Sequence, residues 1–304
     1  MYKKDFSFLV KNAQAAIRPV RVAIAGADAE NILLGAFRAE EEGFARPILL
    51  GNREKIEAML RRLELISRDY ELIEVPEDAS PVQRAIELIH EGKADALMRG
   101  NTQTRDFLMP ILDKKNDLIQ PGRLLTHINL MKLPDYERIL AISDVTIIPN
   151  PDIRQRKEIV RNMAALLRKL GYEKPNIAVL ALAEKPLFRV PDTVEAETIV
   201  RDHQEHPIAN CNLVGPIAYD LIISAEAARL KGYDCPYCGA FDGIVTQNLM
   251  TGNLLVKALE IHGHASSFGV IEGAKIPIAI SSRSDPAEKS YLALAVCASV
   301  PPVD

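Results

Sequence analysis

The chain has 304 residues, of which 48% are hydrophobic and 26% are charged, so it can bury a sizeable core and form two domains. Its net charge of −4 and its pI near 5.9 leave no basic footprint for nucleic acid. No apolar run approaches the length of a membrane span, and the expected location is the cytoplasm.

The first twenty residues have the pattern of an amphipathic helix. Lys3, Lys4, Lys11 and Arg18 lie among apolar positions, and the segment has neither a long apolar centre nor a small-residue cleavage site. These features distinguish the segment from a secretory signal peptide.

Strand and helix patterns alternate from residue 20 onward. Residues 20–25 are rich in β-formers and end at Gly26, and residues 30–42 then have helical spacing of apolar side chains. The same pattern repeats, with strands predicted at 47–50, 70–75 and 95–98 and helices at 53–65, 80–90 and 104–112. Such βα units predict a mainly parallel sheet covered by helices, with ligands bound at the carboxyl ends of the strands.

A polar segment, Arg99-Gly-Asn-Thr-Gln-Thr-Arg105, follows the strand predicted at 95–98. Glycine lets backbone approach a ligand, and Asn101, Thr102 and Thr104 offer neutral donors before a helix start. We therefore expect the segment to bind a ligand. The alternative interpretation is an ordinary βα loop with a threonine cap.

The second half begins at Asn150-Pro151-Asp152, which starts a long helix ending near residue 170, and we place a domain boundary there. Two of its later segments have strand patterns and three have helix patterns. The strands are predicted at 177–182 and 244–246, and the helices at 192–201, 216–230 and 253–261. A last strand and helix span residues 276–296.

The last predicted strand ends in Ser282 and Arg283, and a helix-start signal follows at once. Asp285, Pro286 and Glu288 fit the N-cap, the first-turn proline and the N3 position of that helix. The N–H groups and the positive end of the helix would face a phosphate held by the arginine. The alternative is that these side chains only end a strand and cap a helix.

Cys235 and Cys238 have the C-x-x-C spacing of thiol redox proteins, but their pair follows a predicted helix and does not open one. A zinc site would need two more ligands, and only Cys211, His203 and His206 are near in sequence. A reduced structural loop is therefore favoured over redox or zinc use.

Several motifs occur in one order along the chain. They are residues 184–198 (EKPLFRVPDTVEAET), Gly215-Pro216 with Asp220, Gly239-x-Phe241-Asp242, Gly252-Asn253-x-x-x-Lys257, and Gly273-Ala274-Lys275-x-Pro277 leading to Ser282-Arg283. Together they resemble the phosphate acetyl/butyryltransferase family, and the butyryltransferase branch most closely. The resemblance runs from about residue 20 to residue 298.

The resemblance implies an α/β protein with two domains, each a mainly parallel sheet covered by helices, and an active-site cleft between them. The fold would be related to the isocitrate/isopropylmalate dehydrogenases. Its last strand and helix return to the first domain, so the expected domains are residues 1–149 with 280–304, and residues 150–279. A homodimer, or a higher homo-oligomer, is also implied.

The implied activity is exchange of a short-chain acyl group, preferably butyryl, between coenzyme A and inorganic phosphate. The resemblance implies that a thiolate attacks the acyl phosphate directly, without a metal. It also implies no permanently bound cofactor, since coenzyme A is a substrate. Arg283 would bind the phosphate, and Ser282 would donate to the carbonyl oxygen or the leaving sulfur. Glu288, ranked slightly above Asp285, would help to deprotonate the thiol; some acetyltransferase relatives carry an acid where this chain has Lys289.

Two further segments match the family in part. Arg99 takes the place of the lysine in a Lys-Gly-x-x-x-Thr segment whose threonine is Thr104, so a phosphate-binding charge is kept. Thr126 and His127 match a Ser/Thr-His pair, in which the histidine lines a pocket or is a satisfied buried side chain.

Gly252 and Asn253 suit a turn at a helix start, and Lys257 follows one turn later. Lys257 would meet a phosphate of coenzyme A or line the cleft; a solvated helix lysine is the alternative.

Two other classes of function compete with acyl transfer. An NAD-dependent hydroxy-acid dehydrogenase of related fold is disfavoured because Gly26-Ala-Asp-Ala does not fit G-x-G-x-x-G and no metal-binding carboxylates cluster. A non-catalytic protein that binds acyl-CoA or acyl phosphate is disfavoured because Ser282, Arg283 and Lys257 are retained.

Overall fold

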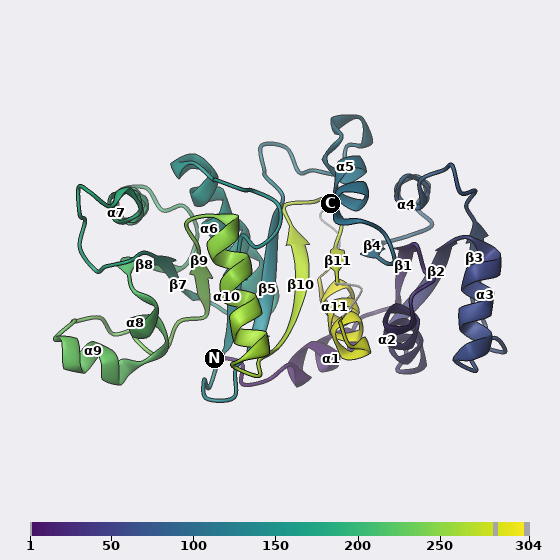
Figure 1. Cartoon of the computed structure of the whole chain (residues 1–304), viewed down its shortest axis with the longest axis horizontal. Helices are drawn as coiled ribbons and strands as arrows, with labels where there is room; N and C mark the ends of the chain where they lie inside the picture. The colour runs from purple at the N-terminus through teal and green to yellow at the C-terminus, as the bar shows by residue number, and fades with distance from the viewer. Residues whose placement is uncertain (1, 282–284, 301–304) are drawn as a thin grey trace. The chain divides into compact units, whose positions relative to one another are not determined.

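The computed structural model describes residues 2–281 and 285–300 (Figure 1). The chain forms two compact units. Unit 1 contains Thr126–Ser267 and the residues before Ser7, and unit 2 contains Ser7–Leu125 and the residues from Phe268 on. Within the described ranges, no helix is both long and apolar enough to cross a membrane.

Unit 2 is an α/β unit whose strands are ordered β3-β2-β1-β4-β11-β10. The strands are β1 (Val20–Ala25), β2 (Ala45–Gly51), β3 (Glu71–Glu74), β4 (Ala96–Arg99), β10 (Ser266–Glu272) and β11 (Ile278–Ile280). All neighbouring pairs are parallel except β10 with β11.

Unit 2 has six α-helices and one 3-10 helix in the residues that the structure describes. They are α1 (Ser7–Gln14), α2 (Glu30–Glu41), α3 (Arg53–Arg62), α4 (Pro81–His90), α5 (Thr104–Leu112), the 3-10 helix η1 (Lys114–Asn116) and α11 (Ala287–Ser299). Helix α2 packs against α11 and β2, and α11 also packs against β1, β2 and β11, whereas α4 packs against α5 and against β1, β2 and β4.

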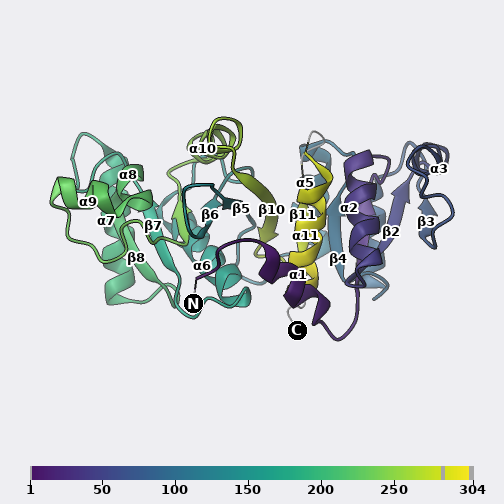
Figure 2. The same ribbon diagram turned by 90° about the horizontal axis from the view of Figure 1, so that it is seen from below.

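Unit 1 has strands in the order β5-β6-β9-β7-β8, parallel except for β5 with β6. The strands are β5 (Thr126–Lys132), β6 (Ile139–Ser143), β7 (Asn176–Leu180), β8 (Asn212–Ile217) and β9 (Gly243–Val245). The helices are α6 (Ile153–Lys169), α7 (Pro191–Glu205), α8 (Tyr219–Ile223), α9 (Ala225–Lys231) and α10 (Leu249–Ile261). Helices α8, α9 and α10 share one hydrophobic cluster with β6, β7 and β9, and Figure 2 shows α10 and α6 on opposite sides of these strands.

The predicted α/β fold with a mainly parallel sheet is confirmed, and two details are corrected. A single helix at 216–230 is wrong, because Pro216 lies in β8 and the helical stretch is divided at Ser224, whose side chain accepts from the Ala227 N–H. A start of α10 at Asn253 is also wrong. Asn248 caps that helix by accepting from the Thr251 N–H at 2.9 Å.

The chain passes from one compact unit to the other at residues 125/126 and 267/268. The sequence instead placed domain boundaries near 150 and 280. Residues 126–149 contain β5 and β6, which were not among the strands predicted from the sequence. Strand β6 pairs with β9, and this pairing assigns both strands to unit 1. The extent of each functional domain stays a prediction.

Candidate active site

Loops of unit 2 meet at the carboxyl ends of the parallel strands β1 and β4. The Gly100 N–H donates to Ala25 O at 2.9 Å, and the Asn101 N–H donates to Gly26 O at 2.6 Å. A Cβ on Gly100 would lie 2.0 Å from Gly26 O, and Gly26 has a φ of +77°. Glycine is therefore required at both positions, because only its backbone permits this approach and this φ.

Arg99 ends β4 and is buried. Its Nε and Nη2 donate to Thr102 O at 3.0 and 2.8 Å. These two atoms form the edge of a guanidinium that commonly binds a carboxylate or phosphate with two hydrogen bonds. Here that edge holds the polar loop after β4 in shape.

The other predicted residues of this loop lie around the start of α5. Asn101 is exposed, and its Nδ2 donates to Asp28 Oδ2 at 3.2 Å. Within the described chain, the buried Thr102 Oγ1 has no hydrogen-bond partner. Thr104 is the first residue of α5, whose N-cap residue makes no side-chain cap hydrogen bond, and Arg105 is exposed. The N-terminus of α5, which is the positive end of the helix dipole, therefore lies at this loop.

A cavity of about 490 Å³ lies at the same edge of unit 2. It is lined by the first residues of α2 and α11, by Met59 and Arg62 near the end of α3, and by Asn101 and Asp285. The N-cap residues of α2 and α11 make no side-chain cap hydrogen bond. Two helix N-termini and one arginine therefore favour an anionic ligand here, while Glu30, paired with Arg62 at 2.5 Å, reduces that preference.

The segment before α11 contains the predicted phosphate-binding pair. Ser282 and Arg283 lie outside the described residues. Asp285 Oδ1 lies 3.0 Å from Lys289 Nζ, and both side chains are mostly buried. The ion pair fixes the Asp285 carboxylate at the cavity.

The capping box predicted for this helix is corrected. Helix α11 begins at Ala287, with Pro286 as its N-cap residue. Pro286 has an extended backbone, with a ψ of 155°, so the helical conformation starts only after it. Asp285 consequently stands before the N-cap and Glu288 is the second helical residue.

Glu288 is directed toward α2. Its exposed carboxylate pairs with Arg38, whose guanidinium lies 3.7 Å from the centroid of the Tyr291 ring. Glu288 is not among the described residues that line the cavity next to Asp285. Of the two predicted acids, Asp285 is the one at the cavity.

In unit 1, the start of β5 lies beside the carboxyl end of its antiparallel neighbour β6. Thr126 is buried and its Oγ1 accepts from Asn162 Nδ2 of α6 at 3.0 Å. His127 Nδ1 lies 2.7 Å from Thr146 Oγ1, and the His127 N–H donates to Asp144 Oδ2 at 3.4 Å. Thr126 thus has a structural partner, and His127 belongs to a buried polar cluster.

Asp144 is a residue of this cluster that the sequence analysis missed. Its buried carboxylate accepts from the N–H groups of Thr146 and Ile147 at 2.7 and 2.9 Å. Burial raises the pKa of Asp144 to about 6, although the backbone N–H groups act in the opposite direction. The signal for it was present, since this acid directly follows the apolar run of β6.

Helix α10 carries the other two predicted residues. Asn253 Nδ2 donates to Val145 O at 3.2 Å, which ties the helix to the residue after Asp144. A Cβ on Gly252 would lie 2.3 Å from Asp144 O, so only glycine permits this packing. Lys257 is exposed and pairs with Glu260 of the same helix at 3.3 Å.

Two residues of the Gly239-x-Phe241-Asp242 motif have structural roles in unit 1. Phe241 is buried in the core, and Asp242 precedes β9. Asp242 Oδ1 pairs with Arg138 Nη1 at 2.9 Å, and its Oδ2 accepts from the Asn176 N–H at 2.9 Å. The motif therefore joins strand starts at the amino end of this sheet, away from the cluster around Asp144.

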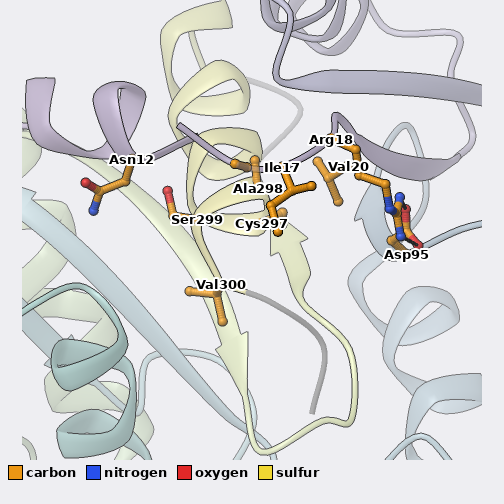
Figure 3. Close-up of a pocket in the computed structure, with 10 residues that line it drawn as sticks. Asn12, Ile17, Arg18, Val20, Asp95, Cys297, Ala298, Ser299 and Val300 are labelled. Atoms are coloured by element: carbon orange, nitrogen blue, oxygen red, sulfur yellow. Dashed lines mark hydrogen bonds and ion pairs between the residues drawn. The ribbon is translucent and has the colours of Figure 1, made fainter. Parts of the chain in front are cut away.

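A second cavity, of about 330 Å³, lies at the amino ends of strands in unit 2 (Figure 3). Val20 at the start of β1, Asp95 before β4 and Cys297 near the end of α11 line it. Arg18 donates to both carboxylate oxygens of Asp95, at 2.6 and 2.8 Å. None of the predicted site residues that the structure describes lines this second cavity. Ligands of open α/β sheets bind at the carboxyl ends of the strands, so the second cavity lies at the opposite end from the expected site.

Cys235 is partly buried, and Cys238 packs in the hydrophobic cluster of unit 1. All four cysteines of the chain are free thiols. Burial raises the pKa of Cys238 to about 12. A thiol with so high a pKa is a poor nucleophile, which fits the structural loop favoured from sequence. Over the described ranges, no group of three or more His, Cys, Asp or Glu side chains is arranged to hold a metal ion.

Known proteins resemble the chain over most of its length. A family model described as phosphate acetyl/butaryl transferase matches residues 77–298. A phosphate acetyltransferase of Rhizobium meliloti is 32% identical over 88% of this chain and 85% of its own length. A phosphate butyryltransferase of Clostridium acetobutylicum is 28% identical over 92% and 93%. The crystal structure of a branched-chain phosphotransacylase from Enterococcus faecalis V583 matches with a TM-score of 0.78 and 27% identity, over 91% of this chain and 97% of that one.

Proposed function

Because this chain belongs to the phosphate acetyl/butyryltransferase family, we propose that it exchanges a short-chain acyl group, with butyryl preferred, between coenzyme A and inorganic phosphate. The resemblance predicted from the ordered motifs is confirmed, and the chain is an acyltransferase whose family uses coenzyme A as a substrate. Its relatives include acetyl and butyryl enzymes at similar identity, so the choice of butyryl is part of the proposal.

The match over most of the chain carries this proposal, and the cavity lined by Asn101 and Asp285 supports it. In the proposed reaction the coenzyme A thiolate attacks the acyl-phosphate carbonyl, a carbon–sulfur bond forms, and the carbon–oxygen bond to phosphate breaks. The reverse reaction forms acyl phosphate. The enzyme must therefore bind a phosphate dianion, stabilise an oxyanion and accept the thiol proton.

From the sequence motif we assign the first two tasks to Arg283 and Ser282. Arginine stays charged and presents a planar fork to phosphate oxygens. The serine hydroxyl donates to the carbonyl oxygen or to the leaving sulfur in the transition state.

For the proton we now prefer Asp285 over Glu288. Support comes from the position of Asp285 at the cavity, held by Lys289, and from the engagement of Glu288 with Arg38. The thiol of coenzyme A resembles that of cysteine, with a pKa of roughly 8.5, so a carboxylate beside it can assist its ionisation.

The remaining predicted residues are proposed as substrate contacts of two kinds. The first kind lies around the start of α5 and would contact the acyl phosphate through neutral donors and one exposed cation; its members are Asn101, Thr102, Thr104 and Arg105. Arg99 keeps their loop in shape. In unit 1 the proposed contacts are Thr126, His127, Asn253 and Lys257, with Lys257 for a phosphate of coenzyme A.

We further propose that the two compact units correspond to two domains of a fold related to the isocitrate/isopropylmalate dehydrogenases, and that the enzyme works in the cytoplasm as a homodimer. A dehydrogenase activity is not proposed, because the relatives by sequence are transferases. A binding protein without catalysis becomes the alternative only if the activity below is missing.

The test is release of free thiol from acetyl-, propionyl-, butyryl- and isobutyryl-CoA, each with and without inorganic phosphate, in the presence of a metal chelator. We expect release that requires phosphate, survives the chelator and is fastest with butyryl-CoA. Release without phosphate would indicate hydrolysis. No release from any of the four would refute the proposed activity.

A further inference from the structure

The cavity at the amino ends of the strands in unit 2 has the features of a small-molecule site (Figure 3). Its volume of about 330 Å³ lies at the lower end of the roughly 300–1,000 Å³ that ligand pockets occupy. Such pockets combine apolar walls with a few polar groups that orient the ligand. All described residues that line the cavity belong to unit 2, so the cavity is a feature of that unit alone.

Most of the cavity wall is apolar. The segment between α1 and β1 contributes Ala16 and Ile17, of which Ile17 is fully exposed. Strand β1 contributes Val20, and the last turn of α11 contributes Cys297 and Ala298. Burial raises the pKa of the Cys297 thiol to about 12, so this side chain is uncharged at neutral pH. An alkyl chain in the cavity would therefore contact apolar groups and remove the Ile17 side chain from water.

The polar end of the cavity carries an excess of positive charge. Asp95 accepts from Nη1 and Nη2 of Arg18 at 2.6 and 2.8 Å. It also accepts from the backbone N–H, Nε and Nη2 of Arg21, at 3.0, 2.9 and 2.7 Å. A carboxylate offers about four lone-pair sites, so these five donors saturate it. Because two arginines share one carboxylate, the cluster has one more positive than negative charge and favours a second anion.

Arg18 is the arginine of this cluster that lines the cavity. Its side chain is 59% exposed, and Figure 3 shows it with Asp95 on one side of the cavity, next to Val20. A guanidinium has five N–H donors. Two of them bind Asp95, and a third lies at the limit of hydrogen bonding to Pro19 O, at 3.5 Å. Arg18 can therefore donate to an anionic group whose apolar part lies against the wall.

We propose that this cavity binds a small amphipathic anion, namely a carboxylate with a short alkyl chain. The carboxylate accepts from Arg18, and the chain lies against Ile17, Val20 and Ala298. The described residues that line this cavity are all different from those that line the cavity at Asp285. The site is therefore separate from the one proposed for acyl transfer, and its occupation does not depend on that reaction.

Equilibrium dialysis with radiolabelled acetate, butyrate, hexanoate and octanoate tests the site, in the absence of coenzyme A and phosphate. The dissociation constant should fall about fourfold for each added methylene until the cavity is full, because each methylene is transferred from water to an apolar wall. Neutral hexanamide, measured by competition with labelled hexanoate, should bind at least about fivefold more weakly, because it lacks the charge that Arg18 attracts. Inorganic phosphate should compete poorly, because it has no apolar part.

Two variants locate the bound carboxylate. Arg18→Gln should raise the dissociation constant of hexanoate at least about fivefold and remove the preference over hexanamide. Ala298→Phe should raise it at least about tenfold, because the added ring occupies the apolar part of the cavity. Arg68→Gln is the matched control and should bind as the wild type does. Arg68 is also a partly exposed arginine of unit 2, paired with Glu41 at 3.5 Å, and it does not line the cavity.

Circular dichroism should show that all three variants are folded. A wild type that binds none of the four carboxylates would overturn the proposal. Equal affinity for hexanoate in the wild type and in the folded Arg18→Gln and Ala298→Phe variants would also overturn it, because the ligand would then lie elsewhere. A dissociation constant that is the same from acetate to octanoate would contradict the apolar wall as a binding surface. None of these measurements uses acyl-CoA, so failure here leaves the proposed acyl transfer untouched.

Discussion

The buried carboxylate of Asp144 makes the stability of this protein depend on pH in a direction that can be measured. Burial raises its pKa from 3.8 to about 6, so the folded chain holds the proton more tightly than the unfolded chain does. The stability that this affinity contributes is fully present below pH 3.8 and is lost as the pH rises through about 6. At about 1.4 kcal/mol for each pH unit, the loss amounts to about 3 kcal/mol.

The Asp144→Asn variant isolates this contribution, because its amide does not titrate. Its oxygen can still accept from the N–H groups of Thr146 and Ile147, while its nitrogen replaces the oxygen that accepts from His127, which adds an offset independent of pH. The free energy of unfolding should be measured by urea titration, followed by circular dichroism, from pH 4 to pH 8.

The wild-type value minus the variant value should fall by about 2 kcal/mol from pH 4 to pH 7, because at pH 4 the unfolded chain has already begun to release the proton. A difference that stays flat would show that the carboxyl titrates with an ordinary pKa. A difference that rises with pH would show that the backbone N–H groups outweigh burial.

Three further predictions concern the site. Arg283→Ala should lose phosphate-dependent turnover by on the order of 100-fold with the fold retained, checked by steady-state kinetics and circular dichroism, and unchanged turnover would remove this arginine from the site. Asp285→Asn should lower kcat/KM at pH 7 by at least about 100-fold, and this deficit should ease as rising pH ionises the thiol of coenzyme A. Glu288→Gln should leave the pH profile of kcat/KM unchanged. It should alter the free energy of unfolding by less than about 1 kcal/mol, because the ion pair of Glu288 with Arg38 is exposed. The reverse pattern would restore Glu288 as the base. Gly100→Ala should destabilise the protein by about 2 kcal/mol or more in urea unfolding, because its Cβ would overlap Gly26 O, and wild-type stability would contradict the close packing of these loops.

Local patterns in the sequence were sufficient for much of unit 2. The strand at residues 20–25 and the helix at 104–112 were predicted with the bounds that the structure has. Apolar spacing with a period of two or of 3.6 residues depends only on near neighbours, which is why such elements can be identified without knowledge of their partners. The ordered motifs likewise identified the family, because each motif is a short stretch of fixed spacing.

Long-range pairing decided what those patterns missed. The antiparallel register of β5 and β6 established these two strands, and it placed Asp144 beside His127. Arg99 carries a charge suited to phosphate in any reading of the sequence. Only the path of its loop shows that two of its donors are committed to Thr102 O.

The sequence by itself determined the family, the alternation of strands and helices, and the residues with the right chemistry for an acyl phosphate. The tertiary structure decided which of them share a surface. It placed Asp285 at a cavity and turned Glu288 toward Arg38, and it left Leu254 exposed on a helix whose apolar content alone predicts burial. The physical reason is that composition sets how strongly a side chain favours burial or charge pairing, whereas the partner that satisfies it is fixed by the packing of segments far apart in the chain.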